Sequence, residues 1–266
     1  MMRQKKLTTQ LLPESPLARR PRAVVVGASS GIGAAIARRL ATEGYVVAAL
    51  ARSKTDLDKL CNGINKTFGE TRALAYEHDV TESAQVPTTF QQLLKDLGGI
   101  DALIYVAGVM PGVEIDEFNL DKSQAMIDTN LTGAIAWLGV GAALFQSMKS
   151  GKLVGISSVA GDRGRVLNPA YNASKAGLDA YLEALRNRLT RLGVQVLTVK
   201  PGFVDTEMLK ASRSPKFGAI SPDRVAAGVW AAMRGRKQLV YLPWYWRWIM
   251  FVVRSVPSFI FRRLSF

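Results

Sequence analysis

The chain has 266 residues, which is enough to bury a complete hydrophobic core in one domain. Its formal net charge is +14, and it contains a single cysteine and a single histidine. One cysteine excludes an intrachain disulfide, and one cysteine with one histidine is too few ligands for a Cys/His metal cluster. Cys61 and His78 are therefore interpreted as structural residues, and no metal is expected.

The positive charge is concentrated at the two ends of the chain. Residues 1–22 contain six Lys or Arg and one Glu, whereas residues 224–266 contain eight Lys or Arg and no acid. The polar, proline-containing residues 1–21 are expected to form a disordered basic arm. Their lack of a sustained apolar stretch argues against a secretory signal and predicts a cytoplasmic chain. Nucleic-acid binding is not expected, because no recognised nucleic-acid module accompanies the charge.

The middle of the chain alternates short apolar segments with amphipathic ones, which predicts parallel strands connected by helices. This pattern indicates a single Rossmann-type α/β domain over residues 22–242, with a doubly wound parallel sheet. Its ligand site is expected at the carboxyl edge of the strands. Strands are expected at 23–26, 45–50, 72–76, 100–105, 153–156, 194–199 and 238–242, and long helices at 121–148 and 169–192.

The first predicted strand leads directly into a glycine-rich turn, Gly27 to Gly33, with the sequence GASSGIG. A helix-forming segment follows the turn. Bare backbone N–H groups and the positive end of a helix dipole would then face a ligand. The order strand, turn and helix therefore predicts an anion-binding site, and it disfavours the alternative of a turn without a ligand.

Tyr171 and Lys175 are four residues apart in a predicted helix, so their side chains share one face. An ammonium beside the phenol would favour the ionised phenol, which could exchange a proton with a substrate oxygen. Such a pair is more often a solvated helix face, but the upstream glycine turn strengthens the catalytic interpretation. Ser158 lies 13 residues before Tyr171.

These motifs, in this order, resemble those of the short-chain dehydrogenase/reductase family, over roughly residues 22–242. The resemblance implies that Tyr171 donates a proton to a developing alkoxide while Ser158 hydrogen-bonds the same oxygen. It also implies that Lys175 lowers the pKa of Tyr171 and holds the nicotinamide ribose. Asn130, in Asp128-Thr129-Asn130-Leu131, would position a water beside Lys175. Ser157 is the alternative to Ser158, but only Ser158 has the interval of the family.

The resemblance also assigns the cofactor site. The expected cofactor-binding residues are Gly27, Ser29, Gly31, Ile32, Gly33, Arg52, Asp79, Val80, Ala107, Gly108, Tyr171, Lys175, Pro201, Gly202, Val204 and Thr206.

Two positions depart from the family pattern. Val26 replaces a threonine and Val106 replaces an asparagine, so neighbouring backbone groups must find other partners.

The end of the second predicted strand indicates which cofactor is used. NAD-dependent members of this fold place an acid there to bind the ribose 2′-OH, whereas an arginine suits a 2′-phosphate. The chain has Arg52 at this point and no acid before Asp56. NADP(H) is therefore expected, with Ser29 or Ser53 as additional contacts. The alternative is that Arg52 is simply solvated at the start of a helix.

Residues 243–266 combine arginines with aromatic residues and contain no acid. Their uncharged runs are far shorter than the ~20 apolar residues that cross a bilayer, and Pro257 should divide them into two short helices. They are predicted to lie as an amphipathic tail on anionic lipid, at the inner face of the cell membrane. Packing on the core or in an oligomer is the alternative, and a homo-oligomer is expected. The predicted basic edge comprises Arg247, Arg254 and Arg262, and the predicted apolar face comprises Trp244, Trp248, Phe251 and Val252.

Within the family, the segment from Ser158 to Arg165 and the aromatic, basic tail resemble the reductases of a lipid-linked keto sugar, decaprenylphosphoryl-2-keto-ribose. The resemblance implies a ketone substrate, with Arg163 and Arg165 near a phosphate unless their loop is merely solvated. Residues 203–220 are expected to form a substrate lid. Reduction of another lipidic or small carbonyl compound is an alternative, as is a non-catalytic redox sensor that binds the cofactor.

Overall fold

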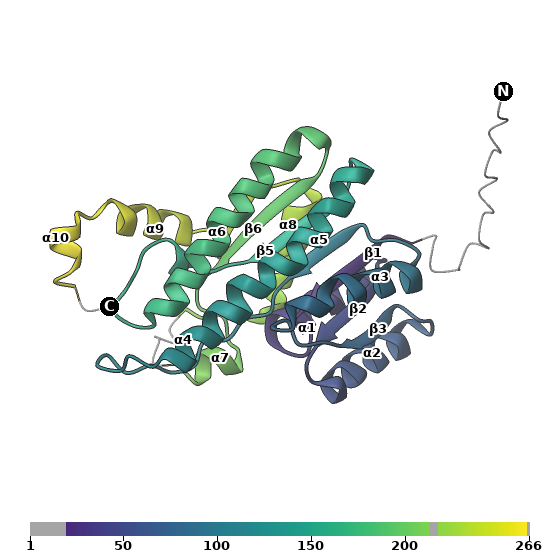
Figure 1. The fold of residues 1–266 in the computed structure, drawn as a ribbon, viewed down its shortest axis with the longest axis horizontal. Coiled ribbons are helices and arrows are strands. Elements are labelled where there is room, and N and C mark those ends of the chain that lie inside the picture. Colours follow the sequence, from purple (N-terminus) through teal and green to yellow (C-terminus); the bar gives the residue numbers. More distant parts are fainter. Residues whose placement is uncertain (1–19, 213–217, 265–266) are drawn as a thin grey trace, which may run out of the picture.

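The computed structural model describes residues 20–212 and 218–264, so most of the predicted arm lies outside the described residues. One seven-stranded parallel sheet forms the centre of the described part, in the order β3-β2-β1-β4-β5-β6-β7 (Figure 1). The chain leaves β1 in one direction as far as β3 and then returns to place β4 on the other side of β1. The strands are β1 (Arg22–Val26), β2 (Val46–Ala51), β3 (Ala73–Glu77), β4 (Ala102–Tyr105), β5 (Lys152–Ile156), β6 (Gln195–Pro201) and β7 (Leu239–Leu242).

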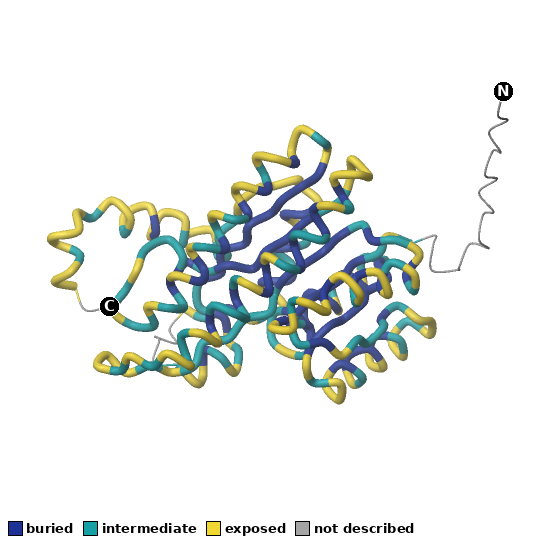
Figure 2. The backbone as a smooth tube through the Cα atoms, in the orientation of Figure 1, coloured by how far each residue is buried: buried dark blue, intermediate teal, exposed yellow. Residues whose placement is uncertain are grey.

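Helices cover both faces of the sheet, because alternate strand residues point to opposite sides. Val25 and Val47 belong to one buried cluster, and Val24 and Val46 belong to the other. The central strands are buried except at the first residues of β1 and β5, Arg22 and Lys152, which are partly exposed (Figure 2). The first cluster includes α1 (Gly31–Thr42), α2 (Lys54–Phe68) and α8 (Pro222–Arg234), and the second includes α3 (Val86–Leu97), α5 (Gly133–Met148) and α6 (Pro169–Leu189).

The predicted doubly wound α/β fold is confirmed, and each predicted strand lies within two residues of an observed one. The predicted helix at 121–148 differs, because it is divided into α4 (Leu120–Ile127), a π-helical turn η3 (Asp128–Thr132) and α5. This run is long and apolar enough to cross a membrane, but Trp137 and Phe145 are fully buried against the sheet. The π turn carries Asn130, and such turns often occur at functional sites.

The tail forms two short helices, α9 (Trp246–Ser255) and α10 (Ser258–Phe261), separated at Pro257 as predicted (Figure 1). The predicted apolar face is solvent-exposed, with side chains 59–71% accessible. The opposite side of α9 packs on the domain, where Met250 is buried and the ring of Trp246 meets that of Phe203 edge-on at 5.5 Å. The tail therefore has two apolar faces. Sequence analysis predicted only the outer one.

Candidate active site

The glycine turn at the end of β1 is shaped by close backbone contacts. Gly27 has φ +94° and Gly31 has φ +50°, in the region that favours glycine. A Cβ on Gly33 would lie 1.9 Å from the carbonyl oxygen of Gly27, so only glycine lets α1 begin so near β1. A Cβ on Gly27 would lie 2.4 Å from the backbone N of Ala107. This packing leaves the start of α1 open to a phosphate-bearing ligand.

Main-chain hydrogen bonds replace those lost with the family's threonine and asparagine. The N–H groups of Gly27 and Ala28 both donate to the carbonyl of Leu50, at 2.8 and 2.9 Å. Those of Val106 and Ala107 donate to the carbonyl of Val26 at similar distances. The two valines therefore leave these backbone groups satisfied.

A cavity of about 350 Å³ lies beside this turn. Arg52 lines it with a side chain that is 69% exposed, 4.0 Å from a carboxylate oxygen of Asp79. Burial raises the pKa of Asp79, but hydrogen bonds from Thr81 and the charge of Arg52 outweigh this effect and lower it. The open glycine turn and the loosely held guanidinium fit a dinucleotide with a 2′-phosphate. The predicted cofactor residues that line this cavity are Gly27, Ser29, Gly31, Ile32, Gly33, Arg52, Asp79, Val80, Ala107, Gly108 and Thr206.

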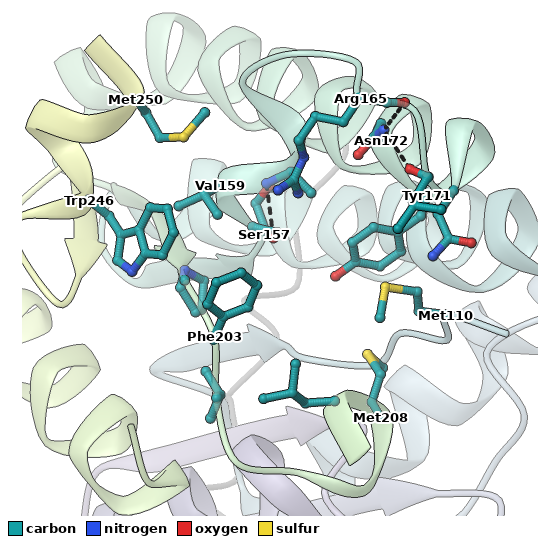
Figure 3. Close-up of a pocket in the computed structure, with 18 of the residues that line it drawn as sticks. Met110, Ser157, Val159, Arg165, Tyr171, Asn172, Phe203, Met208, Trp246 and Met250 are labelled. Carbon is teal, nitrogen blue, oxygen red and sulfur yellow. Dashed lines mark hydrogen bonds between the residues drawn. The ribbon is translucent and has the colours of Figure 1, made fainter. Parts of the chain in front are cut away.

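A second cavity, of about 580 Å³, adjoins the first, and Ile32 and Thr206 line both. Tyr171 lies on one wall, and Phe203 and Met208 lie across from it (Figure 3). Ser158 also lines this cavity. Much of the remaining wall is apolar, which suits a substrate with a hydrophobic part. The predicted residues Pro201, Gly202 and Val204 also line this cavity.

The structure brings the predicted catalytic side chains together. Lys175 is buried in α6, and its Nζ donates to the carbonyl of Ile156 at 3.0 Å and lies 5.7 Å from the centroid of the Tyr171 ring. The Ser158 hydroxyl hydrogen-bonds Tyr171 and accepts from the N–H of Ala160 at 3.1 Å. Ser157 also lines the cavity, but its hydroxyl donates to the carbonyl of Lys175 at 3.3 Å. The geometry therefore favours Ser158 over Ser157.

Asn130 is fully buried and holds the segment that follows β4. Its Oδ1 accepts from the N–H of Val109 at 2.7 Å, and its Nδ2 donates to the Val109 carbonyl and the Ser174 hydroxyl, both at 3.0 Å. A Cβ on Gly108 would lie 3.3 Å from Asn130 Oδ1 and 3.5 Å from Lys175 Nζ. Both polar side chains therefore pack closely against the backbone of Gly108, where little space is left for a side chain. Asn130 thus shapes the site, and its expected role in holding a water stays a prediction.

Burial dominates the electrostatics of Tyr171. Burial raises the pKa of Tyr171 above its usual value, against smaller lowering effects from the Ser158 hydrogen bond and the charge of Arg165. The expected lowering of this pKa by Lys175 stays a prediction, since Lys175 is not among the groups that shift it, and burial lowers the pKa of Lys175 itself to about 8. A phenol that keeps its proton suits a proton donor.

Two arginines predicted to act together have different environments. Arg165 lines the larger cavity near Tyr171 (Figure 3), and burial lowers the pKa of its guanidinium. Arg163 instead contacts α9, so the predicted pair does not form one phosphate site. The inner face of α9 was not predicted from the sequence, although its apolar residues recur every three to four positions, as on one face of a helix. The residues of α9 that line the cavity are Trp246, Ile249, Met250 and Val253.

The fold and the site define a dinucleotide-dependent oxidoreductase of carbonyl or hydroxyl groups. Residues 21–216 match the family described as short chain dehydrogenase, and the chain belongs to that family. It is 33% identical to an uncharacterized oxidoreductase of Mycobacterium tuberculosis over 85% of this chain and 90% of the relative. It is 35% identical to the ketoacyl reductase HetN of a Nostoc species, over 80% of this chain and 75% of the relative.

Among solved structures, the chain is similar to a variant of the actinorhodin polyketide ketoreductase with NADPH. The TM-score is 0.76 and the sequence identity 26%, covering 84% of this chain and 95% of the other.

The Tyr171→Phe variant should retain cofactor affinity and lose turnover by at least ~100-fold, because it lacks the positioned proton donor. Steady-state rates on a reactive soluble ketone, with cofactor binding followed by fluorescence, measure both effects. Tyr181→Phe, on the same helix but away from the cavity, is the matched control. Near-normal turnover by the Tyr171 variant contradicts the assignment.

The kcat/KM for NADPH should fall as pH rises through about 8, where buried Lys175 loses its proton. The sign follows from burial, which favours the neutral amine, so the ammonium that holds the cofactor is present only at lower pH. A pH profile of kcat/KM for NADPH reports the free protein. A flat profile across this range would show that Lys175 does not act as a charged group.

The Arg52→Asp variant should shift the preference from NADPH toward NADH by ~1 to 3 kcal/mol, the range for charge-assisted hydrogen bonds. The ratio of catalytic efficiencies with the two cofactors gives this shift. Lys54→Asp makes the same charge change outside the cavity and should leave the ratio near that of the unmodified protein. A native protein that already prefers NADH contradicts the role given to Arg52.

Proposed function

We propose that this chain catalyses the NADPH-dependent reduction of a ketone to a secondary alcohol on a polyprenyl-phosphate-linked 2-keto sugar, at the inner surface of the cell membrane. One observation carries the proposal: a wall of the substrate cavity is formed by α9, whose opposite face exposes aromatic residues. A substrate whose lipid part stays in the bilayer would meet such a cavity at the membrane surface.

The cofactor of this oxidoreductase is NADP(H). Arg52 at the end of β2 suits the 2′-phosphate, and the similar ketoreductase structure holds NADPH. When bound, NADPH supplies the hydride that reduces the carbonyl carbon. The glycine turn and the start of α1 would hold its phosphates, and Lys175 would hold the ribose next to the nicotinamide.

The residues of this chain supply the proton and the orientation. The Ser158 hydroxyl donates a hydrogen bond to the substrate oxygen, and Tyr171 donates its proton as that oxygen becomes an alkoxide. Because burial keeps the phenol protonated, Tyr171 has a proton to donate near neutral pH. These hydrogen bonds are also stronger inside the cavity than they would be in water, because the local dielectric constant is lower.

Arg165 supports an anionic substrate. Its guanidinium lines the same cavity as Tyr171 and is partly desolvated there, so an incoming phosphate would meet a cation with bidentate donors. A neutral ketone would leave this partly buried cation without a charged partner in the cavity, which costs free energy. The cavity thus combines the catalytic Ser158 and Tyr171, a cation and an apolar wall, which suits a lipid-linked sugar phosphate.

The tail supports a membrane location. Residues 224–266 contain only positive charge, and Trp248 and Phe251 are 59% and 65% exposed on the outer face of α9. Exposed aromatics with basic neighbours are typical of helices that lie in the interface of anionic bilayers. Because the inner face of α9 lines the cavity, removal of the whole tail would also damage the site, so the outer face must be tested by substitution.

The double variant Trp248→Ser, Phe251→Ser should lose binding to liposomes that contain phosphatidylglycerol, while its turnover of a soluble ketone stays near normal. Binding of the unmodified protein should weaken with salt, because roughly 1 kcal/mol per arginine comes from the lipid surface potential, which salt screens. Cosedimentation measures the binding. Leu239→Ser, which changes an exposed residue of β7, is the control. Native protein that ignores liposomes at low salt, or a double variant that changes only the oligomeric state, contradicts the membrane role.

A further inference from the structure

Arg163 lies in the loop 161–168, between the catalytic residues Ser158 and Tyr171. Its Nη1 donates to the carbonyl oxygen of Val253 at 2.6 Å and to that of Val256 at 2.5 Å, at the carboxyl end of α9. Its guanidinium carbon also lies 3.8 Å from the centroid of the Phe261 ring in α10. One side chain of the domain therefore contacts the tail on both sides of the break between α9 and α10.

These contacts are physically well matched. The last carbonyls of a helix have no partner within the helix, and they form the negative end of its dipole. A guanidinium offers several donors in a fixed plane and remains free to stack on an aromatic ring. Arg163 is only partly exposed, so water competes less strongly for its donors. It caps α9 from outside the tail.

The neighbouring residue fixes the same loop to the sheet. Asp162 is almost fully buried, forms an ion pair with Lys200 in β6 and accepts a hydrogen bond from the Tyr241 hydroxyl in β7 at 3.0 Å. Lys200 also lies 2.8 Å from Asp179, one helical turn after Lys175. The loop is therefore held firmly at its base by Asp162 while the next side chain reaches out to the tail.

The loop and α9 form parts of one cavity wall. Arg165, two residues after Arg163, lines the cavity together with Trp246, Met250 and Val253 of α9 (Figure 3). Trp246 packs so closely at the end of β6 that a Cβ on Gly202 would lie 1.9 Å from its Nε1. A shift of α9 thus changes the cavity wall directly, and through Arg163 it also changes the loop that joins the catalytic serine to the catalytic tyrosine.

We propose that Arg163 is a positioning residue that couples the tail to the catalytic loop. Its contacts hold α9 over the substrate cavity and fix the path of the chain from Ser158 to Tyr171. An opening of α9 that admits a bulky substrate breaks these contacts and loosens the loop, and closure restores both. This coupling rests on the oxidoreductase activity and does not depend on a membrane or on a lipid-linked substrate.

Amide hydrogen exchange on the full chain tests the coupling without a substrate. The Arg163→Gln variant should raise exchange by roughly 10-fold or more, the effect of losing charge-assisted hydrogen bonds, both in α9 and in residues 158–168. Arg163→Lys keeps the charge and should give an intermediate effect. Arg247→Gln removes the same charge from the exposed side of α9 and should behave like the unmodified protein. Faster exchange in α9 alone, with the loop unchanged, overturns the proposal.

Kinetics on the soluble ketone isatin give an independent readout. Arg163→Gln should lower kcat/KM for isatin by roughly 10-fold, mainly through KM, while the Kd for NADPH stays constant because Arg163 is outside the cofactor cavity. Phe261→Ala, which removes the stacking partner at a partly exposed position, should cause a smaller loss in the same direction. The double variant Arg163→Gln, Phe261→Ala should be no worse than Arg163→Gln alone. Additive losses, or an equal loss of NADPH affinity, overturn the coupling.

Discussion

Parallel pairing of β1, β4, β5 and β6 places the carboxyl ends of these four strands at one edge of the sheet, and the whole site is built on that edge. The glycine turn follows β1, Gly108 follows β4, Ser158 follows β5 and Gly202 follows β6. The order in which strands are added to the sheet reverses between β1 and β4, and folds of this type hold a dinucleotide in the crevice at that point.

Burial shifts the pKa values of two catalytic groups in opposite directions. Desolvation raises the pKa of Tyr171 and lowers that of Lys175, so each group is moved toward its neutral form. The phenol then carries the proton that a reduction consumes, and the amine is close to titrating at neutral pH. Arg165 adds a cation that stays charged, which makes it the main fixed positive charge that acts on the phenol in this structure. Bound cofactor phosphate and ribose would change this balance further.

Most of the fold and the position of the main chemical groups could be predicted from the sequence, because they depend on local patterns. Strand periodicity, the glycine turn and the spacing from Ser158 to Lys175 are properties of short segments, and the structure places these residues together. The pKa of Tyr171 could not be predicted, because it depends on desolvation by residues that are distant in sequence. The separate roles of Arg163 and Arg165 were hidden for the same reason. Their spacing suggests a pair, whereas packing of α9 turns one toward the tail and the other toward the cavity.

The central claim is that this edge of the sheet transfers a hydride to a carbonyl carbon while Tyr171 provides the proton. The most direct measurement uses NADPH that carries deuterium at its hydride position, a reactive ketone and mass spectrometry of the alcohol formed. The account predicts one deuterium on the carbinol carbon, with formation of the alcohol abolished by Tyr171→Phe. Cofactor oxidation without labelled alcohol, or labelled alcohol formed equally well by the Tyr171→Phe variant, would contradict it.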